Sequence, residues 1–244
     1  MPASPAPRFL HRGPHLEVSL RGDSAESLLV TFDHWRHDKA GFTEMPGETG
    51  YSRGGHTHLH ISTSANDWFL NPDMPKALLK IARFAEGFSR RAALAFSMGG
   101  FGALLVSRVV AFDRVLLVSP HATWSPDDPP HDDRYHAEVR DAAFARAASD
   151  MVHASLKMDA ECVILLDSTS PFDSDHAAAA ARLFTRARLV DLKGGGHPAT
   201  DLLKQAGRFG LVPKALLADR IDESRIVETH YKLRAARQER PLRS

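Results

Sequence analysis

The segment RAALAFSMGGFGALL, residues 91–105, combines a strand pattern and a helix pattern around one serine. RAALAF (91–96) is typical of a buried strand, and a glycine-rich helical pattern begins after Ser97. A serine hydroxyl is a weak nucleophile until a base takes its proton, and it must stand clear of the backbone to react. A sharp strand-to-helix turn achieves this when the residues two before and two after are small, and here they are Ala95 and Gly99. We therefore predict that Ser97 is a nucleophile.

This turn resembles the nucleophile elbow of the α/β-hydrolase superfamily, whose usual form is Gly-x-Ser-x-Gly. The sequence departs from that form at Ala95, which is small enough for the turn. The start of the helix also leaves unpaired backbone N–H groups, and we expect Met98 to supply one of them to a developing oxyanion. The alternatives are a capping serine or a phosphate loop, but the Gly-Lys-Ser/Thr ending of a phosphate loop is missing.

The order of elements along the chain predicts an α/β fold. Buried strand patterns alternate with helical ones, which indicates a mostly parallel sheet covered on both faces, a three-layer sandwich. Right-handed crossovers place the carboxyl ends of the strands along one rim, where ligands bind. The predicted strands are residues 15–20, 28–32, 58–63, 91–96, 114–119, 162–166 and 187–192, and the predicted helices include 72–87, 99–111, 137–154 and 175–184.

The chain has 244 residues, which fits one domain of the larger α/β kind. Residues 1–14 are rich in proline, so we predict a disordered segment there and a single α/β-hydrolase domain over 15–244. A long polar stretch follows the strand at 114–119 and leads into a helical region. We interpret residues 121–158 as a lid-like insertion, because the resemblance implies lids at this point of the chain.

His197 is the predicted general base. The last strand leads directly into KGGGHPATDLLKQAG, residues 193–207. The resemblance implies the chain order serine, acid, histidine, with the histidine in a loop after the last strand. Three glycines let this loop bring the imidazole over the sheet rim toward Ser97. An imidazole with a pKa of about 6.5 can accept the serine proton and return it to the leaving group.

A carboxylate should follow the strand at 162–166, to orient the imidazole and stabilise its charged form. The stretch DSTSPFDSDHA offers Asp167 at the strand end, Asp173 in the following turn and Asp175 as a helix cap. Superfamily acids usually lie a few residues past the strand, which favours Asp173 and leaves Asp167 as the alternative. The spacing Asp-x5-Asp-x2-His-Ala is similar to that of a subgroup of small bacterial α/β-hydrolase-like proteins.

A second oxyanion donor is expected in the loop that follows residues 28–32. Asp33, His34 and Trp35 are the candidates, although the common His-Gly pair of the superfamily is missing from this loop. Without that pair, the sequence does not decide which backbone N–H would face the oxyanion. Together with Met98, we expect Asp33 or His34 to complete the oxyanion hole.

The three tryptophans, Trp35, Trp68 and Trp124, each lie just past a predicted strand. They either form a substrate-binding wall for an acyl or ring group, or they anchor loops to the core. His56, His58 and His60 alternate along one predicted strand and could imitate a metal site. The outer two would lie about 13 Å apart at the rise of a strand, so we expect no metal and no other cofactor.

The composition excludes some partners. Lys plus Arg number 31 and Asp plus Glu number 30, so the balance favours no nucleic-acid partner. The single cysteine, Cys162, lies in an apolar run and is expected to be a buried small hydrophobe. No run is long and apolar enough to be a signal peptide or a membrane span, so we expect a cytoplasmic protein. The oligomeric state stays open.

Three functions are compatible with these features. The favoured one is a serine esterase or thioesterase that forms an acyl-enzyme on Ser97, with an acyl ester, thioester or acylated sugar as its small-molecule partner. An acyltransferase would pass the same acyl group to an alcohol or sugar. The third is a fold relative that serves in binding or assembly without turnover. A serine at position 97 excludes the aspartate-dependent dehalogenase chemistry of this superfamily, and the fold alone does not name a substrate.

Overall fold

A computed structural model of the protein describes residues 8–43, 45, 50–125, 127–134 and 142–239. Its centre is an eight-stranded sheet with the strand order β1-β2-β4-β3-β5-β6-β7-β8. The pairs β1–β2 and β2–β4 are antiparallel, and every other neighbouring pair is parallel. The strands are β1 (Arg8–Arg12), β2 (Leu16–Arg21), β3 (Ser27–Phe32), β4 (Thr57–Thr63), β5 (Arg90–Phe96), β6 (Arg114–Val118), β7 (Met158–Leu166) and β8 (Phe184–Asp191).

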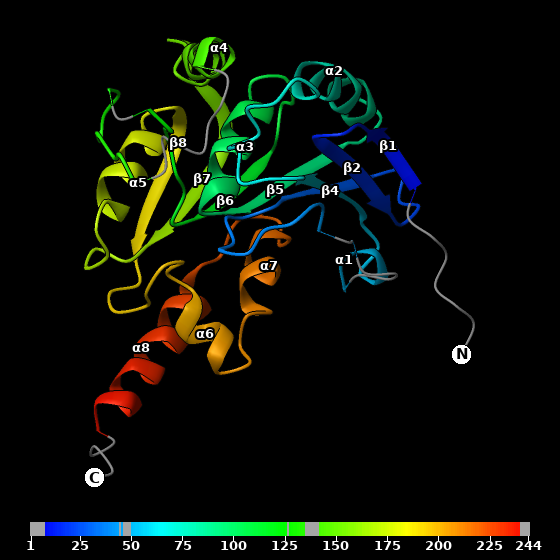
Figure 1. The fold of residues 1–244 in the computed structure, drawn as a ribbon. Helices are drawn as coiled ribbons and strands as arrows, with labels where there is room; N and C mark the ends of the chain where they lie inside the picture. The colour runs from blue at the N-terminus through cyan, green and yellow to red at the C-terminus, as the bar shows by residue number, and fades with distance from the viewer. Residues whose placement is uncertain (1–7, 44, 46–49, 126, 135–141, 240–244) are drawn as a thin grey trace.

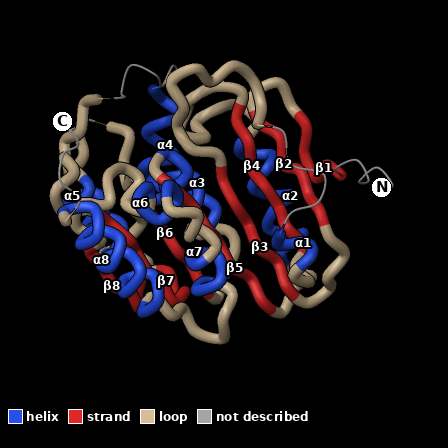
Figure 2. The backbone as a smooth tube through the Cα atoms, turned by 90° about the horizontal axis from the view of Figure 1, so that it is seen from below, coloured by secondary structure: helices blue, strands red, loops and turns tan. Residues whose placement is uncertain are grey.

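Helices cover both faces of the sheet, which confirms the predicted three-layer α/β architecture. Figure 1 shows α2, α3, α4 and α5 above the sheet and α1, α6, α7 and α8 beneath it. The same lower helices lie across the sheet in the view from below in Figure 2. Their bounds are α1 (Gly50–Arg53), α2 (Met74–Ala85), α3 (Met98–Val106), α4 (Ala142–Val152), α5 (Asp173–Ala181), α6 (Asp201–Gln205), α7 (Leu211–Leu216) and α8 (Ser224–Gln238).

The central strands are apolar on both sides because they contribute to two cores. Along β6, Val115 and Leu117 belong to the upper core, and Leu116 and Val118 belong to the lower one. Successive side chains of a strand point to opposite faces, so a strand between two helical layers has no polar alternation. This is why the continuously apolar runs of the sequence predicted a covered sheet.

The prediction that residues 1–14 are disordered is wrong for Arg8–Arg12, which form β1. Residues 1–7 lie outside the described residues. β1 pairs in antiparallel fashion with the outer edge of β2, and Arg8 at its start is the register partner of Leu20. The prolines of this stretch favoured a segment without regular structure, but a short edge strand forms because its backbone groups can pair with β2.

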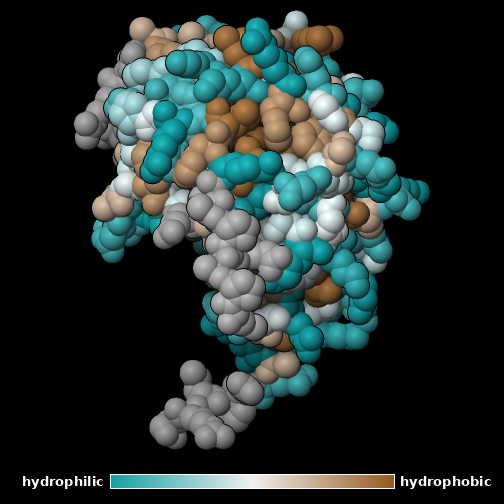
Figure 3. All heavy atoms as spheres, turned by 90° about the vertical axis from the view of Figure 1, so that its right-hand side faces the viewer, coloured by the Kyte–Doolittle hydropathy of each residue, from teal (hydrophilic) through white to brown (hydrophobic). Residues whose placement is uncertain are grey.

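Figure 3 shows the face of the molecule with β1 and α2, where apolar side chains are exposed in small groups between polar ones.

The chain between β6 and β7 is the longest connection of the upper layer. The structure describes residues 119–125, 127–134 and 142–157 of it, and the last of these ranges includes α4. Residues 126 and 135–141, which belong to the predicted lid, lie outside the described residues. Across the described part of the chain, we find no helix with the length and apolarity needed to cross a membrane.

Candidate active site

Ser97 forms the turn between β5 and α3 and has a φ of +48° and a ψ of −121°. A positive φ is strained for a residue with a side chain, and such strain concentrates at functional sites. The neighbouring chain fixes the turn: the Ser97 N–H donates to the Val118 carbonyl at 3.0 Å, and the Ser97 carbonyl accepts from the N–H of His121 at 3.0 Å. The turn is therefore built by β5 and β6 together, at the carboxyl ends of both strands.

Glycines after the serine are required by close approaches from other loops. A Cβ on Gly99 would lie 2.5 Å from the carbonyl oxygen of Asp33, and a Cβ on Gly100 would lie 2.5 Å from the Cβ of Pro120. Both distances are too short for real contacts, so any larger residue would displace the turn. The residue two positions after Ser97 is small because the loop that follows β3 lies directly against it.

His197 connects the serine to a carboxylate. Its Nε2 lies 2.9 Å from Oγ of Ser97, and its Nδ1 lies 2.8 Å from Oδ1 of Asp173. Because a carboxylate accepts at Nδ1, the neutral imidazole carries its proton there and offers Nε2 as the acceptor for the serine hydroxyl. Asp173 is buried, which limits its competing contacts with water. The structure thus brings three of the predicted residues into one row of hydrogen bonds.

Asp167, the alternative acid, lies at the end of β7 and holds the loop that carries His197. Its carboxylate accepts from the N–H groups of Gly194 at 3.0 Å and Gly196 at 2.8 Å. Burial alone would raise the pKa of Asp167, but the hydrogen bonds from Thr169 and the two glycines lower it below its ordinary value. Asp167 makes no hydrogen bond to the imidazole, and its contacts fix the backbone before His197.

Among the oxyanion donors expected from the sequence, Asp33 is excluded because its backbone N–H is already used. Its N–H donates to the carbonyl of Ile61 at 2.9 Å, which continues the β3–β4 ladder by one residue. The ladder runs one residue beyond the predicted strand end, and this is why the sequence misplaced the donor. His34 follows Asp33 directly and is exposed, and Met98 opens α3 beside the serine. Their N–H groups remain the candidates.

Asp33 instead anchors the loop between β3 and α1 through its side chain. Lys39 donates to Oδ2 at 2.6 Å and Ser62 donates to the same oxygen at 2.6 Å, while Thr43 donates to Oδ1 at 2.5 Å. The side chains of Asp33 and Lys39 are 2% and 1% exposed. Burial would raise the pKa of Asp33, but Lys39 and the hydroxyl groups hold it below its ordinary value. Lys39 gave no sequence signal, because a lysine in a polar loop is normally solvated.

We expect Lys39→Met to destabilise the fold by about 3–5 kcal/mol, because it leaves the Asp33 carboxylate buried without its counter-charge. Chemical denaturation compares this variant with Lys76→Met, a matched change at an exposed position of α2 that should stay within about 0.5 kcal/mol. Adding Asp33→Asn to Lys39→Met should recover part of the loss. Equal stability of the two lysine variants would contradict a stabilising role for this ion pair.

Solved proteins share this architecture at low sequence identity. The capsule O-acetyltransferase of Neisseria meningitidis serogroup A, a mutant in complex with CoA, is 12% identical with a TM-score of 0.54 over 81% of this chain and 91% of that chain. Bromoperoxidase from Bacillus anthracis is 13% identical, with a TM-score of 0.52 over 88% and 99%. Acetyl xylan esterase 1 from Thermoanaerobacterium sp. is 11% identical, with a TM-score of 0.50 over 78% and 77%. No protein-family model and no curated protein matches the sequence.

The strand order, the serine turn after β5 and the histidine loop after β8 decide the architecture. The chain has the α/β-hydrolase fold. Ser97, Asp173 and His197 follow one another along the chain in the order serine, acid, histidine that is usual for this hydrolase fold. The identity to the solved proteins is too low to carry a substrate from any of them to this chain.

Within the hydrolase fold, the three tryptophans occupy different environments. Trp68 is fully buried and stacks on His121, with ring centroids 5.7 Å apart, so it anchors a loop and presents no surface to a substrate. Trp124 is half-buried and donates its indole N–H to the Ala145 carbonyl at 3.2 Å, which ties the start of the insertion to α4 within it. Trp35 is half-buried in the loop after β3 and lies beside His37. For Trp68 the prediction of a substrate wall is wrong, because its ring fills the core.

His58 and His60 of β4 belong to a buried polar network, whereas His56 lies just before the strand and bonds to Ser27. Thr31 Oγ1 lies 2.7 Å from Nε2 of His58 and 2.9 Å from Nδ1 of His60. Among the residues described, no three histidine, cysteine, aspartate or glutamate side chains form a group that could hold a metal ion. Burial, with His60 beside it, lowers the pKa of His58 to about 3. Both rings therefore act as neutral hydrogen-bonding groups under the sheet.

This depressed pKa predicts acid sensitivity. The unfolded chain takes up a proton on His58 below its ordinary pKa of 6.5, whereas the folded chain does not, so stability falls as the pH is lowered. Between about pH 7.5 and 5.5, the wild-type protein should lose about 1.4 kcal/mol more than His58→Gln, which retains a hydrogen bond to Thr31. Urea unfolding at both pH values measures the difference. Equal losses in the two proteins would show that His58 is not held neutral.

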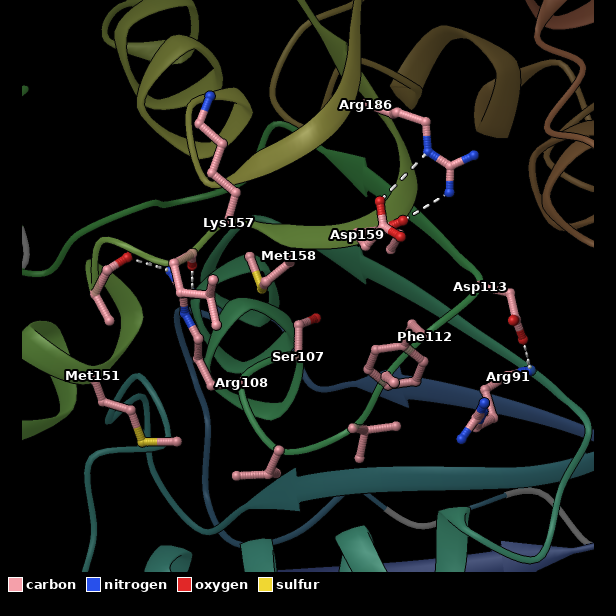
Figure 4. A pocket seen from close by; sticks show the side chains of 16 residues that line it. Arg91, Ser107, Arg108, Phe112, Asp113, Met151, Lys157, Met158, Asp159 and Arg186 are labelled. Atoms are coloured by element: carbon pink, nitrogen blue, oxygen red, sulfur yellow. Dashed lines mark hydrogen bonds and ion pairs between the residues drawn. The ribbon is translucent and has the colours of Figure 1, made fainter.

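A cavity of about 810 Å³ lies at the opposite edge of the sheet, where the strands begin. Four cationic residues line it, Arg91, Arg108, Lys157 and Arg186, and Figure 4 shows Asp159 beside Arg186 and Asp113 beside Arg91. Arg108 donates to the carbonyl groups of Val152, Ala154 and Leu156, so its guanidinium holds the end of α4. Ser97, His197 and Asp173 do not line this cavity, so the cavity is not part of the candidate active site.

Proposed function

We propose that this protein is a serine-dependent acyl-transfer enzyme that hydrolyses an ester or thioester. The observation that supports the proposal most directly is the continuous row from Ser97 Oγ through His197 to Asp173, with distances of 2.9 and 2.8 Å. A nucleophile, a base within hydrogen-bond reach and a third group that orients the base are the parts needed for an acyl-enzyme mechanism. The strained turn that presents the serine adds independent support.

In the first half of the proposed reaction, Ser97 Oγ attacks the carbonyl carbon of the substrate while its proton moves to Nε2 of His197. The carbonyl oxygen becomes an oxyanion, which the N–H groups of Met98 and His34 would stabilise. The tetrahedral intermediate then collapses, and the bond from carbon to the leaving oxygen or sulfur breaks. His197 gives its proton to the departing alcohol or thiol, and the acyl group stays on Ser97.

In the second half, a water molecule attacks the acyl-enzyme, and His197 again accepts and returns a proton. The carboxylic acid leaves and the serine hydroxyl is restored. Asp173 stabilises the imidazolium that forms in both halves and keeps the imidazole in the tautomer with Nδ1–H. Asp167 would act indirectly, by fixing the glycine loop that positions His197.

Transfer of the acyl group to an alcohol or sugar is the second candidate. The capsule O-acetyltransferase, solved with CoA, has the same fold, and so does the acetyl xylan esterase. Both kinds of protein therefore use this scaffold, and the acyl-enzyme on Ser97 is common to both reactions. The difference lies only in whether water or a second hydroxyl attacks it.

A substrate screen tests the proposal. Short- and long-chain acyl esters, acyl thioesters and acylated sugars are offered to the wild-type protein and to Ser97→Ala, with and without sugar or alcohol acceptors. We expect turnover of at least one class that disappears in the variant, and the products identify hydrolysis or transfer. If a folded wild-type protein turns over none of these classes, or if Ser97→Ala is equally active, the proposed mechanism is refuted.

A further inference from the structure

A second histidine–carboxylate pair lies close to Asp173, outside the hydrogen-bonded series of Ser97, His197 and Asp173. His176 is buried on α5, one turn after Asp173, and its Nε2 lies 3.0 Å from Oδ2 of Asp132. Its Nδ1 accepts the backbone N–H of Ala122 at 3.1 Å, so the proton of the neutral ring is on Nε2 and points to Asp132. Both ring nitrogens are thus used, and His176 joins α5 to the start of the insertion after β6.

Asp132 is in turn held by the neighbouring arginine. Nε and Nη2 of Arg134 donate to its two oxygens at 2.8 and 2.6 Å, a two-pronged contact that fixes the plane of the carboxylate. The guanidinium also lies over the ring of Phe172, 4.7 Å from its centroid. Arg134 therefore contacts Phe172, the residue before Asp173, and Asp132 contacts His176, which lies one turn after Asp173.

The turn that carries the acid needs such support. Phe172 has a φ of +63°, which is strained for a residue with a large side chain and persists only where surrounding contacts fix it. Asp173 follows at once and opens α5. Its Oδ1 must stay within hydrogen-bond distance of His197, so a shift of α5 or of this turn acts directly on the imidazole.

The two histidine systems are also in contact through His121. Its ring is nearly parallel to that of His176, with centroids 5.0 Å apart, and lies 5.8 Å from that of His197. Burial, with His176 and His197 beside it, holds the pKa of His121 well below its ordinary value. The His121 ring is therefore neutral and places no positive charge next to His197.

We propose that Asp132 and His176 are positioning residues for the reaction: they lock the Phe172–Asp173 turn and the His121 ring, so that Asp173 and His197 keep their alignment with Ser97. This inference rests on the proposed function, because it assigns a supporting network to the same site. The network connects the insertion after β6 to the helix that carries the acid, because Asp132 and His176 are 44 residues apart in the chain.

The test replaces His176 with Phe, which keeps an aromatic ring in the stack but removes both hydrogen bonds. We expect kcat on the substrate found by the screen to fall by about tenfold to a hundredfold, with KM changed by less than about twofold, because the loss concerns alignment. The proton between His197 Nδ1 and Asp173 should give a low-field NMR resonance in the wild-type protein that weakens or disappears in the variant. His176→Gln, which retains a donor toward Asp132, should recover part of the lost kcat and part of the resonance intensity.

The matched control is His153→Phe. His153 also binds Ala122, through Nε2 to the carbonyl oxygen at 3.1 Å, and this hydrogen bond involves neither Phe172 nor Asp132. This control should leave kcat and the resonance unchanged. If His176→Phe does not fold, Asp132→Asn carries the same readouts.

The NMR arm separates this inference from the proposed function. A wild-type protein without Ser97-dependent turnover would refute the function, and the resonance would still report whether the network aligns His197. A folded His176→Phe protein with wild-type kcat and an unchanged resonance would overturn the positioning role. So would the absence of the resonance from the wild-type protein, or an equal effect of His153→Phe.

Discussion

Ser97→Ala should reduce kcat by about 10⁴- to 10⁶-fold while leaving KM within a few-fold of wild type. The hydroxyl is the group that forms the acyl bond, and residual rate would come from the oxyanion hole and from substrate binding alone. Alanine removes only one oxygen from a turn that the Val118 and His121 backbone contacts hold in place. The measurement is steady-state kinetics on the best substrate of the ester screen, with enzyme purified free of contaminating esterases.

The matched control for this variant is Ser107→Ala. Ser107 ends the same helix and donates to the Ala103 carbonyl at 2.7 Å, at the opposite end of α3 from Ser97. Loss of this bond should leave kcat within about twofold. A similar residual rate in Ser97→Ala and Ser107→Ala would mean that the serine turn is not where the chemistry occurs.

Asp173→Asn should reduce kcat by about 10⁴-fold, and Asp167→Asn by no more than about tenfold. An amide at 173 keeps the shape of the acid but favours the wrong tautomer of His197 and removes the charge that stabilises the imidazolium. Asparagine at 167 loses a charged acceptor for the N–H groups of Gly194 and Gly196, so its main effect is on the loop.

The two variants therefore differ in kind. Asp167→Asn should lower the stability by about 1–3 kcal/mol, as expected when buried donors lose a charged partner. For Asp173→Asn we expect a smaller change in stability and the larger change in rate. Thermal unfolding and kinetics on the same samples measure both quantities. A reversed order of the two rate effects would show that Asp167, and not Asp173, serves the histidine.

The parts that follow from local patterns could be predicted from the sequence. A buried strand, a serine between small residues and a glycine-rich helix require one turn, and that turn has the expected backbone at Ser97. The glycines before His197 likewise indicate a loop that bends over the sheet rim. In both cases the constraint is steric and lies within a few residues of the site, so the sequence expresses it directly.

The remaining parts depend on contacts between distant residues. Asp167 and Asp173 are both carboxylates near the end of β7, and only the direction of each side chain separates a loop anchor from a partner of His197. Lys39 and Asp132 are charged residues in polar loops, where the ordinary expectation is a solvated side chain. Lys39 is paired with Asp33 and Asp132 with His176 because the fold buries these side chains, and a local sequence pattern does not indicate that burial.

The backbone ladder explains the misplaced oxyanion donor in the same way. Asp33 lies just past the apolar run of β3, and its N–H is used because β4 extends beside it as far as Thr63. Strand ends depend on how far the neighbouring strand continues, and the sequence of one strand does not contain that information. Trp68 is a second example: a large ring just past a strand end can point into the core or toward a ligand, and the sequence does not show which direction it takes.

The central claim is that the hydroxyl of Ser97 is activated by His197, and labelling with a fluorophosphonate tests it most directly. The folded wild-type protein should gain the mass of one phosphonyl group, and peptide mapping should place that group on Ser97. Ser97→Ala should not be labelled, and His197→Ala should be labelled far more slowly. A well-folded wild-type protein that stays unlabelled, or that carries the group on another residue, would contradict the account.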